Sequence, residues 1–151
     1  MLEIAKTEDF EAELTNILEQ SCQAEGWKYA EVWVPDGRML RCHTSHYMAS
    51  EQLAVFRNES EEFTFTAGSG LPGRVWMLET PEWIENVTLE PAIYYRSDIA
   101  KKVGLKAALG VPIIAKGEVI AVVAFYRDEA QPPNESLIAE CCDRIQSLIA
   151  P

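Results

Sequence analysis

Residues 107–127, AALGVPIIAKGEVIAVVAFYR, form the stretch that decides the fold of this chain. They predict two strands, Ala107–Ala115 and Glu118–Arg127, joined by a tight hairpin turn at Lys116-Gly117. The second strand is almost continuously apolar, at Val119, Ile120, Val122, Val123 and Phe125. Because such a strand has no polar side to turn toward water, we expect it in the centre of a sheet with both faces covered.

Helices are predicted on both sides of this hairpin. Before it, a helix runs from about Pro91 to Val103 and ends at Gly104. After it, Pro132 and Pro133 cannot extend a helix, and Asn134 is a good N-cap for a last helix that continues to the C-terminus.

The N-terminal part begins with an amphipathic helix over about Thr7–Glu25. Thr7 is its capping residue, Gly26 is placed to end it, and its apolar face is formed by Phe10, Leu14, Ile17 and Leu18. A hairpin follows, with strands over Tyr29–Val34 and Met39–Tyr47 around the turn Pro35-Asp36-Gly37. Four short elements complete the chain: a helix over Glu51–Arg57, a glycine-rich loop over 67–73, a helix with Val75, Trp76 and Leu78, and a strand over Glu82–Glu85 after Pro81.

This order of elements favours an α+β fold on an antiparallel sheet, because hairpins dominate and no β-α-β repeat is visible. We expect one domain over residues 1–151, which could be excised from a longer signalling protein. The Gly68-x-Gly70-x-x-Gly73 spacing resembles a dinucleotide fingerprint but lacks the β-α-β unit that the fingerprint requires, so we assign these glycines to a sharp loop.

Composition limits the function. The net charge is −11, and such an acidic surface repels nucleic acid and anionic membranes. No apolar run approaches the roughly 18 residues of a membrane span, and the first residues lack a signal-peptide pattern. We therefore expect a cytoplasmic protein with reduced cysteines at Cys22, Cys42, Cys141 and Cys142, and their spacing predicts no metal site.

The last helix carries an apolar stripe with spacings of 3, 4 and 3, formed by Ile138, Cys141, Ile145 and Leu148. The stripe could pack on the domain's own core. It could also form a coiled-coil-like seam of a dimer or a signalling helix that continues toward a neighbouring domain.

Five segments of the chain resemble GAF domains of bacterial sensory proteins, particularly those of cyanobacterial multidomain histidine kinases. They are AEVWVPDG (30–37), GLPGRVW (70–76), WIENV (83–87), GLKAALGVPI (104–113) and GEVIAVVAFY (117–126). The resemblance implies an antiparallel sheet of about six strands, with the first and last helices on one face and a small-molecule pocket under loops and short helices on the other. Members of the family bind cyclic nucleotides, haem, bilins, amino acids or other metabolites, and some only dimerise.

Within that layout, the segments expected to cover the pocket contain Trp76, Trp83, Tyr94 and Tyr95, with Arg74 and Arg96 as possible partners of an anion. His43 is a further candidate, because one imidazole is sufficient for axial haem ligation. His43 and His46 lie three apart on a predicted strand, so they should face opposite sides and not share a metal.

The sequence does not match the motifs that GAF domains use for bilin attachment, cyclic-nucleotide binding or reductase activity. The pair Cys42-His43 resembles the covalent bilin attachment site of phytochrome-type GAF domains. In those domains the cysteine lies shortly before the segment that corresponds to Gly104-Leu105-Lys106, and Tyr94–Ser97, just upstream of that segment, contain no cysteine. The Asn-Lys-Phe-Asp-Glu signature of cyclic-nucleotide binders is missing from the sequence. Free methionine sulfoxide reductases need activated cysteines near the pocket, and nothing in the sequence indicates one. These observations argue against a bilin, haem and a catalytic role.

The sequence therefore predicts a small-molecule-sensing regulatory domain of the sensor-histidine-kinase type, not an enzyme. We expect it to form a homodimer through its terminal helices and to transmit the ligand state through them. The alternative is a ligand-free GAF module that acts as a dimerisation spacer. Haem- or bilin-binding sensors and a methionine sulfoxide reductase-like enzyme are weaker alternatives.

Overall fold

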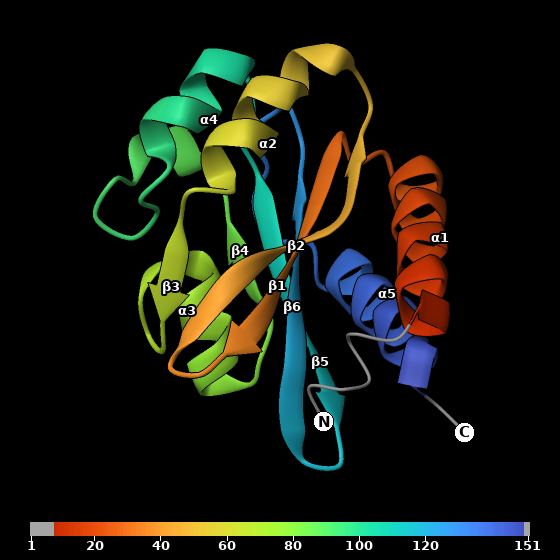
Figure 1. Ribbon diagram of the computed structural model, residues 1–151. Helices are drawn as coiled ribbons and strands as arrows, with labels where there is room; N and C mark the ends of the chain where they lie inside the picture. The colour runs from red at the N-terminus through yellow and green to blue at the C-terminus, as the bar shows by residue number, and fades with distance from the viewer. Residues whose placement is uncertain (1–7, 150–151) are drawn as a thin grey trace.

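A computed structural model describes residues 8–149 of the chain (Figure 1). Its six-stranded sheet has the order β3-β2-β1-β6-β5-β4, and every neighbouring pair of these strands is antiparallel. The strands are β1 (Tyr29–Asp36), β2 (Met39–Met48), β3 (Thr64–Thr66), β4 (Glu82–Ile84), β5 (Ala108–Ala115) and β6 (Glu118–Tyr126). The α+β class and the expected strand number are confirmed.

The helices fall into two groups. The α-helices are α1 (Glu8–Glu25), α2 (Ala54–Ser60), α3 (Gly70–Leu78), α4 (Ser97–Val103) and α5 (Glu135–Gln146), and the 3-10 helices are η2 (Glu51–Leu53), η3 (Val87–Leu89) and η4 (Ser147–Ile149). Figure 1 shows α1 and α5 together on one side of the sheet, away from α2, α3 and α4. The capping role predicted for Thr7 lies outside the described residues.

The β5–β6 hairpin has the predicted form. Lys116 and Gly117 both have positive φ, 52° and 81°. Two-residue hairpin turns whose twist matches that of the strands require positive φ at both positions. β6 lies between β1 and β5 in the sheet, and all of its residues except Glu118 are buried. The central, doubly covered strand expected from its apolar run is therefore confirmed.

Two apolar cores cover the two faces of the sheet. The first joins α1 and α5 to the sheet through residues such as Leu14, Leu18, Val123 and Ile145. The second lies under α2, α3 and α4, and contains Phe56, Phe65, Tyr94 and Tyr126. This is the layering that the resemblance implied, with the terminal helices on one face and short elements on the other.

Several elements differ from the sequence prediction. The turn expected at Pro35-Asp36-Gly37 lies later, because β1 continues through Pro35 and Asp36, which pair with Leu40 and Met39. The helix expected from Pro91 begins only at Ser97, because residues before it form turns closed by the bond from Tyr94 N to Glu90 O (2.8 Å). The three-residue strand β3 was not predicted. The expected glycine loop is shorter, because α3 already begins at Gly70 and includes Gly73. A Cβ on Gly73 would lie 2.2 Å from Thr66 O, so close backbone approach explains this glycine.

Candidate functional site

The four aromatic residues expected to line one pocket are not brought together. Tyr94 is buried in the second core, Trp76 packs partly against it, and Tyr95 is 53% exposed beside Phe65. Trp83 packs on the other face of the sheet, against Trp27. The reason is that successive side chains along β4 point to opposite faces of the sheet. Its indole Nε1 donates to the carbonyl of Gln131 (2.7 Å).

Arg74 and His43 are both engaged within the fold. Arg74 pairs with Glu82 through Nη2 and Oε2 (2.6 Å) and donates from Nη1 to Ile93 O (2.8 Å), which ties α3 to β4 and to the turns before α4. His43 faces the terminal-helix side, where its Nε2 lies 3.2 Å from Glu11 Oε1. It is therefore directed away from the short-helix face of the sheet.

Arg96 lies in the centre of a buried polar cluster on that second face. It forms two hydrogen bonds with the carboxylate of Glu31, Nη1–Oε1 at 2.8 Å and Nη2–Oε2 at 2.7 Å. Further bonds from Arg96 reach Ser60 Oγ and Tyr126 Oη, each at 2.9 Å. The side chains of Arg96 and Glu31 are 1% and 0% exposed. The anion partner predicted for Arg96 is thus supplied by the chain itself.

Aromatic groups complete the surroundings of this ion pair. Glu31 Oε2 also accepts hydrogen bonds from Trp33 Nε1 (2.7 Å) and Tyr126 Oη (3.1 Å). The Arg96 guanidinium carbon lies 5.0–5.6 Å from the ring centroids of Trp33, Phe56, Phe65 and Tyr94. Burial alone would lower the pKa of Arg96, but Glu31 raises that pKa well above its usual value, so the guanidinium stays charged.

A second buried arginine, Arg57, belongs to this region, and its carboxylate partner is half exposed. Arg57 donates from Nη2 to His43 O (2.6 Å) and from Nε to Glu61 (3.0 Å), whose side chain is 51% exposed. Burial raises the pKa of Tyr29, and the guanidinium groups of Arg57 and Arg96 partly offset this rise. Tyr29 lies beside Arg57. The side chains of Arg57 and Tyr29 lie within hydrogen-bonding reach of each other, whereas Arg96 Nε is buried and has no hydrogen-bond partner among the described residues. We call Tyr29, Glu31, Arg57, Arg96 and Tyr126 the arginine cluster.

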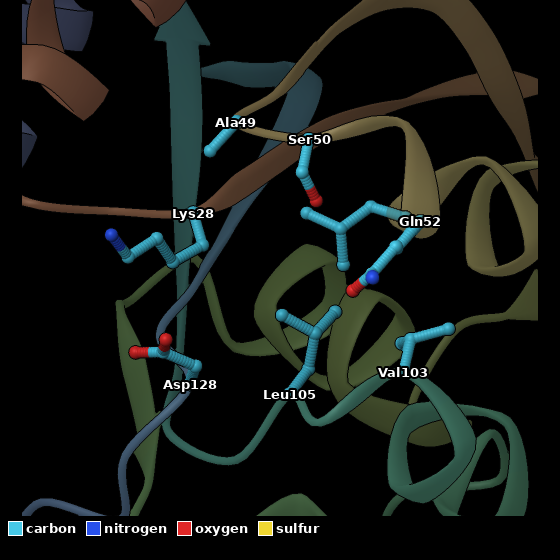
Figure 2. A pocket seen from close by; sticks show the side chains of 8 residues that line it. Lys28, Ala49, Ser50, Gln52, Val103, Leu105 and Asp128 are labelled. Carbon is cyan, nitrogen blue, oxygen red and sulfur yellow. The ribbon is translucent and has the colours of Figure 1, made fainter.

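An open pocket lies at one end of the sheet (Figure 2). Its volume is about 270 Å³, and it is lined by Lys28, Ala49, Ser50, Gln52, Leu53, Val103, Leu105 and Asp128. Leu53 and Leu105 are buried and form an apolar base, whereas Lys28, Ser50, Gln52 and Asp128 are exposed and form a polar rim. We call this the end pocket. Sequence reasoning did not identify any of its residues, because they come from four separate segments.

The cysteine thiols are not activated. Burial raises the pKa of Cys42 to about 12 and raises the pKa of Cys22 and Cys141 still further. A raised pKa removes the thiolate that nucleophilic and redox cysteines require. Among residues 8–149, no three His, Cys, Asp or Glu side chains are grouped as metal ligands.

The stripe of the last helix is used partly by the domain itself. Cys141 and Ile145 are fully buried in the first core, while Ile138 and Leu148 pack against it with part of their surface accessible. No helix within the described part of the chain is long and apolar enough to cross a membrane.

Plant proteins are among the known proteins with similar sequences. Arabidopsis thaliana protein NLP8 is 27% identical over 153 residues, covering 89% of this chain and 16% of that protein. Arabidopsis thaliana protein NLP9 is 31% identical over 132 residues, covering 79% of this chain and 15% of that protein. The chain therefore spans about one sixth of the length of these relatives.

Similar solved structures come from microbial proteins and share the fold. The GAF domain/HD domain protein of Geobacter sulfurreducens matches with a TM-score of 0.76 at 13% identity, covering 96% of this chain and 92% of that one. A nitrate-binding-site mutant of Staphylococcus aureus NreA matches with a TM-score of 0.63 at 22% identity, covering 82% and 89%. The free methionine-R-sulfoxide reductase of Neisseria meningitidis matches with a TM-score of 0.68 at 17% identity, covering 96% and 80%.

The family is decided by the sequence itself. The family model described as GAF domain matches residues 7–140, which include all six strands and the first half of α5. GAF domains are generally regulatory sensing modules, although reductases share the fold. With its two-faced sheet, its terminal helix pair and this match, the chain belongs to the GAF domain family.

Proposed function

We propose that this GAF domain is the input module of a signal-transduction protein and that its input is a small monovalent oxyanion of the nitrate class. The single observation that carries the proposal is the charge of the arginine cluster. Two buried guanidinium groups face only one fully buried carboxylate, since Glu61 is half exposed. Glu61 is therefore a solvent-screened partner of Arg57 (3.0 Å), and a small anion beside Arg57 would add a buried partner to this guanidinium.

Two neighbouring buried side chains suit the same ligand. Arg57 Nη1 and Tyr29 Oη are buried neighbours that can both donate to one oxygen-rich anion. Burial raises the pKa of Tyr29 above its usual value, which keeps this phenol a proton donor. The likeness to NreA, whose printed description refers to a nitrate binding site, supports this ligand class. Sulfate or phosphate would bring two negative charges into a site whose two guanidinium groups already have carboxylate partners.

The test is titration of the purified domain with sodium nitrate against sodium chloride and sodium sulfate at equal ionic strength, followed by calorimetry and thermal unfolding. Nitrate should bind and raise Tm, whereas the other salts should not. Tyr29→Phe removes one donor to the anion and should weaken binding about 10- to 100-fold. Tyr47→Phe changes a half-buried tyrosine that packs on the opposite face and should leave nitrate affinity unchanged.

Two results would count against the proposal. If nitrate neither binds nor stabilises the wild-type domain, the dimerisation-spacer reading is favoured. If nitrate binds equally well to Tyr29→Phe, the anion occupies a different place.

The raised thiol pKa values support a regulatory rather than a reductase role, and reduced thiols support a cytoplasmic location.

The proposed output runs through the terminal helices. A groove of about 260 Å³ between α1 and η4 is lined by Glu13, Asn16, Ile17, Gln20, Ser147 and Leu148. Its apolar residues Ile17 and Leu148 could seat a helix of a second copy, and Ile138 is the other member of the stripe with accessible surface. A homodimer and a histidine-kinase context are parts of this proposal. Sedimentation with and without nitrate tests whether dimerisation responds to the ligand.

A further inference from the structure

We propose that the end pocket is a second ligand site, distinct from the arginine cluster, which binds a free aliphatic α-amino acid. The pocket presents one cation, Lys28, and one anion, Asp128, on the same side, as Figure 2 shows. Among the described residues, neither side chain forms an ion pair or a hydrogen bond. An ammonium group placed at Asp128 and a carboxylate placed at Lys28 would satisfy both.

The remaining walls match the rest of such a ligand. Leu53 and Leu105 are buried and Val103 is half buried, so they offer an apolar base for an aliphatic side chain. Ser50 and Gln52 add hydrogen-bonding groups at the rim, across from Asp128 in Figure 2. The volume of about 270 Å³ lies just below the range of about 300–1,000 Å³ that is typical for drug-sized ligands. A metabolite of amino-acid size fits that volume.

The backbone around Lys28 is fixed before any ligand arrives. Lys28 N donates to Tyr126 O and Ala49 N donates to Lys28 O, both at 2.8 Å. On the opposite wall, Leu105 N donates to Ala100 O (3.0 Å), directly after the α4 C-cap at Gly104. A rim held in place by the sheet loses little conformational freedom on binding, which favours affinity for a small ligand.

The position of the end pocket connects it to both terminal helices. Lys28 lies in the link from α1 to β1, and Asp128 lies in the link from β6 to α5. Arg127, next to Asp128, donates from Nη2 to Glu25 O at the end of α1 and from Nη1 to Gln131 Oε1 (2.7 Å) before α5. Its guanidinium carbon also lies 4.5 Å from the Trp27 ring centroid. A ligand held between Lys28 and Asp128 would therefore tighten both helix links together.

The experiment is a thermal-shift and calorimetric titration with L-leucine, using analogues that each lack one feature. L-Leucine at ten times its Kd should raise Tm by about 4 °C. N-acetyl-L-leucine lacks the ammonium group, L-leucinamide lacks the carboxylate, and glycine lacks the side chain, so each should bind at least about tenfold more weakly. Hydrogen exchange should slow in residues 22–27 and 131–138 when L-leucine is bound.

Variants locate the site. Lys28→Gln and Asp128→Asn should each weaken L-leucine binding about tenfold or more, and both positions are exposed, so folding should be retained. Lys116→Gln and Glu118→Gln, in the exposed β5–β6 turn, are the matched controls and should not change binding. Tyr29→Phe should lose nitrate affinity and keep L-leucine affinity, so failure of one ligand proposal is distinguishable from failure of the other.

The proposal is overturned if L-leucine produces no shift at millimolar concentration. It is also overturned if L-leucinamide and N-acetyl-L-leucine bind as well as L-leucine, or if neither pocket variant weakens binding. Binding without any change in hydrogen exchange at the two links would refute the coupling to the terminal helices.

Discussion

Replacing Glu31 by glutamine tests the central physical claim about the buried face of the sheet. Glu31→Gln keeps the shape of the side chain but leaves the charged Arg96 without its carboxylate in a site where both side chains are almost fully buried. Breaking a buried ion pair from one side costs about 3–5 kcal/mol, because the remaining charge is desolvated and unpaired. For a domain with about 5–15 kcal/mol of total stability, this is a large fraction.

The assay is urea unfolding followed by circular dichroism, together with the thermal midpoint. Glu31→Gln should lower the free energy of unfolding by about 3–5 kcal/mol and lower Tm by about 10 °C. The double variant Glu31→Gln/Arg96→Met removes both charges and should recover part of the loss. Arg41→Gln is the control, because Arg41 and Asp36 are 57% and 63% exposed and such pairs contribute only about 0–1 kcal/mol.

A loss below about 1 kcal/mol for Glu31→Gln would refute the reasoning, since it would mean that water or a bound ion reaches Arg96 freely. The variant also bears on the proposed ligand. Removing Glu31 raises the net positive charge of the arginine cluster, so nitrate should stabilise Glu31→Gln more than it stabilises the wild-type domain. Equal stabilisation of both would place nitrate away from Arg96.

Three other predictions concern single features of the fold. Asn134→Ala removes the side-chain acceptor for Leu137 N at the start of α5 and should cost about 1 kcal/mol in chemical unfolding, while Asn134→Asp should cost little. Gly73→Ala forces a methyl group against the carbonyl of Thr66 and should lower stability by about 1–3 kcal/mol or prevent folding, as seen by circular dichroism. Burial raises the pKa of Tyr94 and Tyr126, so the folded state keeps protons that the unfolded chain releases. Stability should be unaffected below about pH 10 and fall above it, and the phenolate absorbance of these two residues should appear only on unfolding.

Local patterns predicted much of the fold because their causes are local. The turn at Lys116-Gly117 needs positive φ at two successive residues, and the N-cap needs only Asn134 and the first turn of its own helix. The apolar run of β6 could be satisfied only by cover on both faces. The start of α4 was predicted six residues too early, because contacts with other elements hold the turns at 91–96, such as the hydrogen bond from Arg74 to Ile93 O.

The candidate sites depended on tertiary structure. Glu31 is a charged residue flanked by apolar residues in β1, a pattern typical of a solvent-exposed position, yet the short elements over the sheet bury it fully. Its partner Arg96 is 65 residues away, and no sequence spacing relates the two. The aromatic residues were grouped by segment, but the alternation of β4 sends Trp83 to the other face.

By itself, the sequence determined every strand except β3, the terminal helices and the family, because each follows from periodicity, turn chemistry and caps within short segments. Only the tertiary structure decided which charges are buried together and where a pocket opens. The arginine cluster and the end pocket each join residues from several elements, and burial and cavity shape arise only when those elements pack. Electrostatic interactions in a protein depend on that burial, so the chemistry of both sites was set by packing.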